Sequence, residues 1–172
     1  MQCLSNLRQV ALAFKTWSLD GDEFPAAAPI QRRGAKEAAE AGQVFSVFKV
    51  VSNELTSPKR LVCPLDKQRT AATNFGPQFS DNNISYFLGL EAGDAVPYAF
   101  LSGDRNLASR TGALGHGVFP VSTNTWLNWT KDIHRSRGNV ALSDGSVRML
   151  DQTNLLKAIQ GQGIQTNRLA IP

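Results

Sequence analysis

The residues suited to acid–base or nucleophilic chemistry are few in this chain. It contains 2 histidines and 2 cysteines among 172 residues. Ser143, His134 and Asp104 supply the side chains of a Ser–His–Asp triad, but no G-x-S-x-G nucleophile elbow accompanies them, and such trios arise freely by chance. We therefore predict that the protein is not an enzyme and has no catalytic residue. We expect His134 instead to hold a loop through hydrogen bonds to the backbone.

The two cysteines, Cys3 and Cys63, admit two interpretations. They lack the clustered spacing of about four ligands that predicts a zinc site, so no metal ligand and no cofactor is assigned to them. An even number of cysteines permits one disulfide between Cys3 and Cys63 if the compartment is oxidising. In a reducing compartment both are expected to be small buried hydrophobic residues.

Acidic residues give no complete calcium motif. Asp20, Asp22 and Glu23 resemble a fragment of a calcium loop, but the EF-hand spacing D-x-[DN]-x-[DN]-G is not met. An isolated calcium site there, or near Asp104 or Asp144, stays open as an alternative. The glycine motifs that cradle phosphates, G-x-x-x-x-G-K-[ST] and G-x-G-x-x-G, do not occur in the sequence.

The charge of the chain is mildly basic, with a formal net charge of +4. This charge is too small and too dispersed to predict nucleic-acid binding by itself. A solvated surface is the simplest interpretation of the basic residues, and contact with an anionic ligand is the alternative. The densest basic groups are Arg32, Arg33 and Lys36, and, farther along the chain, Arg135 and Arg137.

An amphipathic helix over residues 1–19 is the element that must position much of the rest. Its apolar stripe has the 4-3-4-3 spacing of one helical face, and consists of Cys3, Leu7, Val10, Phe14 and Trp17. Asp20-Gly21 is a typical stop signal, since glycine often follows the last helical residue. No capping residue precedes the helix. We expect the pattern to continue upstream in a longer chain, of which residues 1–19 are the lower half of a spine.

The opposite face of this helix contains one large apolar residue, Leu12, among Ser5, Arg8 and Thr16. A single exposed leucine is normal on a protein surface. The alternative interpretation is that Leu12 contacts a neighbouring helix in an assembly.

The remaining patterns predict one α+β domain over 1–172, with an antiparallel sheet packed on the N-terminal helix. Two β-prone runs on either side of Asp144-Gly145 are typical of a hairpin. The final residues are expected to form a loose or docked tail. The predicted elements are a short helix at 35–41, a second helix near 44–55, strands at 60–63, 83–90, 97–102, 139–143 and 146–150, and a short C-terminal helix at 152–160.

Several stretches resemble type IV pilin-like and type II secretion pseudopilin-like proteins, of the kind abundant in Planctomycetes and Verrucomicrobia. The most specific stretch begins at His134 and fits that group's C-terminal H-x9-D-G signature, with Asp144 and Gly145 as its other members. We treat these three residues as a structural signature. The other resembling stretches are 3–14, 52–55, 58–66, 83–87 and 102–106.

This resemblance implies a pilin-like fold and a non-enzymatic structural subunit of a type II secretion or type IV pilus-type assembly. The full-length prepilin is expected to be anchored in the inner membrane by an apolar segment absent here, with its head in the periplasm or at the cell surface. No run here reaches the roughly 20 apolar residues of a membrane span, so the chain as given is expected to be soluble.

The partners implied are other pilin-like subunits, through the N-terminal helix, and the secretion or pilus machinery. The alternative function is a minor-pilin-like binding module for DNA, a glycan or a secreted substrate. The two cases differ in the surface that makes the functional contact, which is the N-terminal helix in the first case and the basic groups in the second.

Overall fold

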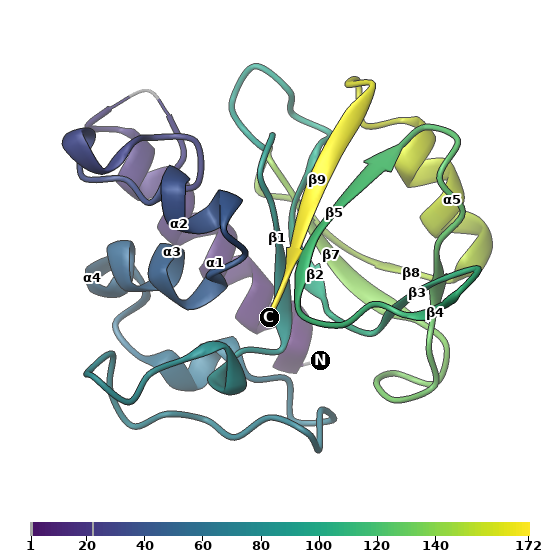
Figure 1. Ribbon diagram of the computed structural model, residues 1–172, viewed down its shortest axis with the longest axis horizontal. Coiled ribbons are helices and arrows are strands. Elements are labelled where there is room, and N and C mark those ends of the chain that lie inside the picture. The colour runs from purple at the N-terminus through teal and green to yellow at the C-terminus, as the bar shows by residue number, and fades with distance from the viewer. Residues whose placement is uncertain (1, 22) are drawn as a thin grey trace.

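A six-stranded antiparallel sheet separates two layers in the computed structural model, which describes residues 2–21 and 23–172 (Figure 1). Its strand order is β5-β9-β1-β2-β7-β8, and a second sheet has the order β4-β3-β6. The helices are α1 (Gln2–Ser18), α2 (Lys36–Glu40), α3 (Val44–Val50), α4 (Ser52–Leu55) and α5 (Gln152–Gln160). The strands are β1 (Tyr86–Gly89), β2 (Phe100–Asp104), β3 (Leu107–Ser109), β4 (Gly112–Ala113), β5 (Gly117–Ser122), β6 (Asn128–Trp129), β7 (Gly138–Leu142), β8 (Val147–Leu150) and β9 (Thr166–Ile171).

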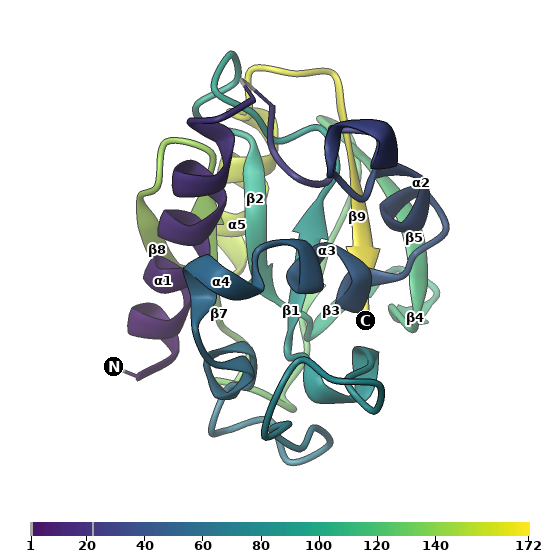
Figure 2. The same ribbon diagram turned by 90° about the vertical axis from the view of Figure 1, so that its left-hand side faces the viewer.

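Helix α1 packs against the part of the large sheet formed by β2, β7 and β8, and Figure 2 shows it with α3 and α4 in front of the strands. The apolar stripe predicted for this helix is confirmed, since Cys3, Leu7, Val10 and Phe14 are buried while Trp17 is half-buried. The predicted α+β class and the packing of an N-terminal helix on an antiparallel sheet are therefore confirmed.

Within residues 2–21 and 23–172, no helix combines the length and apolarity that crossing a bilayer requires.

The large sheet has an apolar core on each side. Successive side chains of a strand point to opposite faces, so Leu88 packs with α1 and α3 in one core while Phe87 packs in the other. On the second side, α5 buries Leu155 and Ile159 against the sheet. Both faces are thus covered, which explains why β1, β2 and β7 are buried at every position.

The predicted hairpin around Asp144-Gly145 is confirmed by the antiparallel pairing of β7 with β8. The turn needs the left-handed backbone at Gly145, whose φ is +88°. The Asp144 carboxylate accepts a hydrogen bond of 2.8 Å from the Ser146 amide and so stabilises the turn. The predicted pairing of the strands near 83–90 and 97–102 is confirmed as β1 with β2, and the C-terminal helix as α5.

Residues 60–63 do not form the strand that their β-prone types predict. A 3-10 helix, η2 (Pro58–Leu61), takes up the first two of these residues, and the other two are irregular. Pro58 has the φ that suits the first helical position, and the Ser57 side chain accepts a hydrogen bond from the Lys59 amide. These local signals outweigh the strand propensity of Leu61 and its neighbours.

The helix predicted near 44–55 is divided into α3 and α4. Val51 has left the helical region, with φ −93° and ψ 22°, and Val47 and Leu55 on the two sides of this break are both buried. A continuous helix of this length would present its apolar residues to one flat face. The break lets the segment follow the surface formed by α1.

The C-terminal residues are not a tail, because β9 lies inside the large sheet between β5 and β1. Ala170 pairs with Val118 on one side and with Leu88 on the other. The pairing joins residues that are far apart in the chain, and no local turn signal announces it. The last strand therefore closes a sheet that residues 86–150 leave incomplete.

Candidate functional site

A buried row of polar side chains crosses the sheet beneath the start of α1. Tyr86 of β1 pairs with Asp104 of β2, and Asn139 of β7 pairs with Met149 of β8. The Asp104 Oδ2 atom accepts hydrogen bonds from the Asn139 backbone amide at 2.6 Å and from its Nδ2 at 2.8 Å, which joins the two pairs into one row. Tyr86, Asp104 and Asn139 are all fully buried, so this row places polar groups inside the core that lies between the sheet and α1.

Two cysteines and one histidine lie over this row. The Sγ atoms of Cys3 and Cys63 and one ring nitrogen of His134 all lie within 4.8 Å of one another. Cys3 is in the first turn of α1, Cys63 follows η2, and His134 is in the loop before β7. The Cys63 Sγ atom is 3.3 Å from His134 Nε2. Tertiary structure thus gathers the side chains best suited to chemistry.

His134 contacts side chains, which corrects the prediction that it bonds to the backbone. Its Nε2 atom is 3.0 Å from Asn139 Nδ2 and 3.4 Å from Asp104 Oδ2, in addition to its contact with Cys63. The residue has a left-handed backbone, with φ of 53°, and so do Arg135 and Ser136 after it. Non-glycine residues adopt this conformation at a cost of about 1–2 kcal/mol each, so other contacts must hold the loop.

Asn106 supplies those contacts. Its Nδ2 atom lies within hydrogen-bond distance of three carbonyl oxygens, those of Thr130 at 3.1 Å, Ile133 at 3.0 Å and Arg137 at 3.2 Å. The Thr130 amide in turn donates to the Asn106 carbonyl at 2.8 Å. One buried amide therefore clamps both ends of the loop that carries His134.

We predict that Asn106→Ala lowers the free energy of unfolding by about 2–3 kcal/mol, because it leaves buried carbonyl groups without a donor. Denaturant unfolding monitored by circular dichroism measures this loss. Asn53→Ala is the matched control, since Asn53 is exposed on α4 and its replacement should change stability by less than about 0.5 kcal/mol. Equal losses in the two variants would contradict the clamp.

The groups of the cluster shift one another's pKa values in opposite directions. A hydrogen bond from the Cys63 thiol lowers the pKa of Cys3, against the opposing effect of burial. The shared hydrogen bond and burial raise the pKa of Cys63. The hydrogen bond with Cys63, followed by the charge of Asp104, raises the pKa of His134. Burial raises the pKa of Asp104 to about 6 despite its hydrogen bonds from Asn139.

A groove of about 270 Å³ opens onto this cluster. Cys3, His134 and Asn139 form part of its wall, and Leu4, Leu65 and Met149 contribute apolar surface. Leu65 and Met149 are about half-exposed, at 50% and 46%. The Cys3 thiol and the His134 imidazole can therefore be reached from solvent through this groove, whereas Cys63 and Asp104 are fully buried.

The members of the H-x9-D-G signature do not form one site. His134 precedes β7 and Asp144 follows it, so the two lie at opposite ends of this strand. His134 joins the buried cluster, whereas Asp144 and Gly145 form the hairpin turn. The signature therefore combines two separate structural roles.

The three residues considered for a Ser–His–Asp triad do not lie together either. Asp104 is next to His134, but the Ser143 Oγ atom is at the far end of β7, where it donates to the Ala99 carbonyl at 3.3 Å and accepts from the Gly93 amide at 3.1 Å. A serine so placed cannot give its proton to His134. The structure thus offers no geometry for triad chemistry at these residues.

The predicted basic residues lie in two separate places. Arg32 forms an ion pair of 2.9 Å with Glu23, just beyond the end of α1. Arg135 and Arg137 follow His134 in the loop before β7, and a ring nitrogen of His134 lies within 4.8 Å of the Cys3 Sγ atom at the start of the same helix. Since α1 has 17 residues, its ends are about 25 Å apart. Arg33 and Lys36 are exposed near Arg32, so the basic groups do not form a single anionic-ligand surface.

The suggested calcium residues do not converge either. Glu23 is engaged with Arg32, Asp104 is enclosed by Asn139, and Asp144 stabilises its own turn. Asp22 lies outside the described residues. Among the residues described, the group with metal-ligand geometry is instead Cys3, Cys63 and His134, a set that the search for clustered zinc spacing missed.

Sequence reasoning missed this group because its members are far apart in the chain, with Cys63 and His134 separated by 71 positions. One signal pointed to them. The stretches that resemble pilin-like proteins each contribute a member: 3–14 contains Cys3, 58–66 contains Cys63, 102–106 contains Asp104, and the signature begins at His134. The suggested disulfide pairs the same two cysteines, which are present as free thiols.

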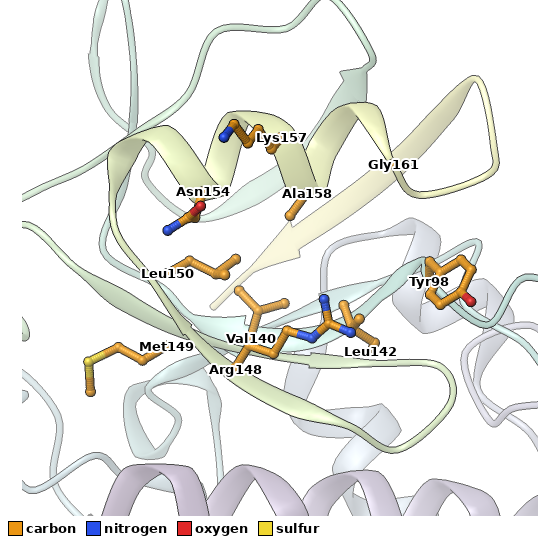
Figure 3. A pocket seen from close by; sticks show the side chains of 10 residues that line it. All are labelled: Tyr98, Val140, Leu142, Arg148, Met149, Leu150, Asn154, Lys157, Ala158 and Gly161. Carbon is orange, nitrogen blue, oxygen red and sulfur yellow. The ribbon is translucent and has the colours of Figure 1, made fainter.

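A second groove, of about 420 Å³, lies between α5 and the β7–β8 hairpin. Figure 3 shows Asn154, Lys157 and Ala158 on the helix at one side of this groove and Val140, Leu142 and Arg148 on the strands at the other, while the side chain of Met149, which is also part of the lining, extends away from α5. This orientation places Met149 near the cysteine–histidine cluster, in agreement with its place in the wall of that groove.

The fold and the cluster define an α+β protein with a buried thiol–imidazole group under its N-terminal helix. Comparison of the chain with models of protein families, with curated proteins and with solved structures gives no match.

Proposed function

We propose that this chain is the head of a pilin-like structural subunit of a type II secretion or type IV pilus-type assembly, without enzymatic activity. The observation that carries the proposal is the asymmetry of α1. One face is buried against the sheet, while the opposite face is exposed along its whole length and contains Leu12, whose exposed fraction is 58%. A helix held in this way can pack on other subunits without unfolding the head.

The exposed face of α1 supports this interpretation further. Ser5, Arg8 and Thr16 are exposed beside Leu12, and Leu19 follows at the end with an exposed fraction of 82%. A mostly polar face with two widely spaced leucines suits contacts that form with like helices and that do not cause aggregation of the free head. Pilin-type assembly uses contacts between N-terminal helices.

The proposal predicts which segments the complete reading frame encodes before Gln2. A basic leader, a prepilin-peptidase cleavage site and an apolar helix of about 20 residues are expected directly before it. Sequencing the complete reading frame tests this. A signal peptide followed by no such helix would overturn the assignment to a pilin-type subunit.

We predict that Leu12→Glu lowers the fraction of full-length protein incorporated into filaments, because a charge replaces the apolar contact on the exposed face of α1. The free energy of unfolding of the head should change by less than about 0.5 kcal/mol, since the residue is exposed. Incorporation is measured by sedimentation of sheared filaments and immunoblotting.

Ile30→Glu is the control for this prediction, because Ile30 is also exposed, at 69%, but lies outside α1. Its incorporation should equal that of the unmodified protein. Equal incorporation of the Leu12→Glu and unmodified proteins would remove the role given to this face. The binding-module alternative has weaker support, since its basic residues lie at opposite ends of α1.

A further inference from the structure

We infer that Cys3, Cys63 and His134 form a binding site for a thiophilic metal ion, with Zn²⁺ as the best-fitting ion. Thiolate sulfur and imidazole nitrogen are the ligands that zinc prefers in proteins, and thiolates exclude hard cations such as Ca²⁺ and Mg²⁺. Binding replaces the protons of both thiols by the metal and releases these two protons to solvent. No change of oxidation state is involved.

The ligand atoms already have the separation that such an ion requires. In a tetrahedral site, Zn–S bonds of about 2.3 Å and Zn–N bonds of about 2.0 Å place a sulfur and a nitrogen ligand about 3.5 Å apart and two sulfur ligands about 3.8 Å apart. The Cys63 Sγ atom lies 3.3 Å from His134 Nε2, and all three ligand atoms lie within 4.8 Å of one another. Small rotations of the side chains therefore suffice to bring them to bonding distance.

Rigid elements hold each ligand in place. One turn after Cys3, the Asn6 side chain donates to the Val62 carbonyl at 3.2 Å, which ties α1 to the residue before Cys63. Cys63 is fully buried, and the Asn106 clamp described above holds the loop of His134. A site built on such supports loses little conformational entropy when it takes up an ion.

The buried carboxylate behind the ligands suits a cation. Asp104 is fully buried, and its Oδ1 atom has no hydrogen-bond partner among the described residues. Its Oδ2 atom is 3.4 Å from His134 Nε2. A buried carboxylate oxygen without a hydrogen-bond partner is costly, and positive charge at the cluster offsets that cost. We assign Asp104 the role of a positioning residue beside the ligands.

Metal binding competes with one contact of the metal-free cluster. Asn139 Nδ2 lies 3.0 Å from the His134 Nε2 atom that would bind the ion. The amide loses this hydrogen bond when the metal takes the nitrogen lone pair. Access is available through the groove, whose wall includes Cys3 and His134.

The experiment is a titration of the reduced, purified chain with Zn²⁺ alone and with Co²⁺ as a spectroscopic substitute. One ion per chain is expected, with thiolate-to-cobalt charge-transfer bands that Zn²⁺ abolishes, and with about two protons released per ion. At a free Zn²⁺ concentration 100 times the dissociation constant, the melting temperature should rise by roughly 5–11 °C.

Variants identify the ligands. Cys63→Ser and His134→Ala should both abolish tight binding, and at saturating Co²⁺ the complex of Cys63→Ser should retain about half of the charge-transfer intensity. Asp104→Asn should weaken affinity by about 10–100-fold, as loss of a supporting carboxylate does at other metal sites. The matched control is His116→Ala, because His116 is exposed and pairs with Asp81 at 3.2 Å, away from the cluster. Its affinity and band intensity should be unchanged.

Circular dichroism of each metal-free variant establishes that loss of binding does not reflect loss of the fold, and a variant that does not fold is replaced by Cys3→Ser. Less than half an ion per chain, or equal binding by His134→Ala and His116→Ala, would overturn the inference. So would a Cys3–Cys63 disulfide that persists in the chain isolated from its natural compartment, detected by mass under non-reducing conditions. None of these readouts depends on filament assembly.

Discussion

Replacing Phe14 with alanine is expected to lower the free energy of unfolding by about 3–5 kcal/mol. Phe14 is fully buried where α1 meets the helical layer. Its ring makes edge-to-face contacts with Phe24, at 6.1 Å between centroids, and with Phe48, at 6.0 Å. Truncation removes both aromatic contacts and leaves a cavity among rings that belong to three separate segments.

Urea unfolding at equilibrium measures the loss at Phe14, and Leu12→Ala on the same helix is the control. Leu12 is 58% exposed, so its truncation should change stability by less than about 0.5 kcal/mol. Phe14→Leu keeps most of the volume and should cost roughly 1–2 kcal/mol, which keeps the test informative if the alanine variant fails to fold. Similar losses at positions 12 and 14 would contradict the observed orientation of α1.

Asp66→Ala is expected to have an effect of similar size, about 3–5 kcal/mol, because it breaks a buried ion pair and leaves a cation behind. Asp66 accepts two hydrogen bonds from Arg105, at 2.7 Å and 2.9 Å, and the side-chain exposures of Arg105 and Asp66 are 14% and 2%. The pair ties the segment after Cys63 to the end of β2. The double variant Asp66→Leu with Arg105→Met should recover much of the loss, since no charge then stays buried.

The pH dependence of this pair has a definite sign. Burial alone would raise the pKa of Asp66, but the hydrogen bonds and charge of Arg105 outweigh it and hold that pKa below its ordinary value. The stabilisation is therefore complete above the unfolded pKa of about 3.9 and is lost as the pH falls through the lower pKa of the folded state. The stability difference between the unmodified protein and Asp66→Ala should be constant from pH 7 to pH 5 and shrink below pH 4.

Asp94→Ala is the control for Asp66, because Asp94 pairs with Lys15 at the surface with a side-chain exposure of 54%. Exposed ion pairs contribute at most about 1 kcal/mol. Thermal unfolding of both variants over this pH range, followed by circular dichroism, gives the comparison. A stability difference for Asp66→Ala that grows toward acid pH would show that the carboxylate is not stabilised in its charged form.

Local sequence patterns predicted the elements whose signals are local. The stripe from Cys3 to Trp17 predicted α1 and its buried face, and Asp144-Gly145 predicted the β7–β8 hairpin, because helical periodicity and turn chemistry act between near neighbours. The same reasoning gave the wrong structure for residues 60–63 and took β9 for a tail. Strand propensity is weak against a proline-led helical turn, and pairing with β5 and β1 has no local signal.

The amino-acid sequence by itself determined that this chain forms an α+β domain with an amphipathic N-terminal helix and that its thiol and imidazole side chains are few, namely Cys3, Cys63, His116 and His134. Only the tertiary structure decided that Cys3, Cys63 and His134 meet, over the carboxylate of Asp104. The physical reason is that hydrophobic burial of α1 and pairing of β1, β2 and β7 bring together residues that are far apart in the chain and do not follow the spacing of any sequence motif. A site that is assembled by long-range packing can be recognised only when the tertiary structure is known.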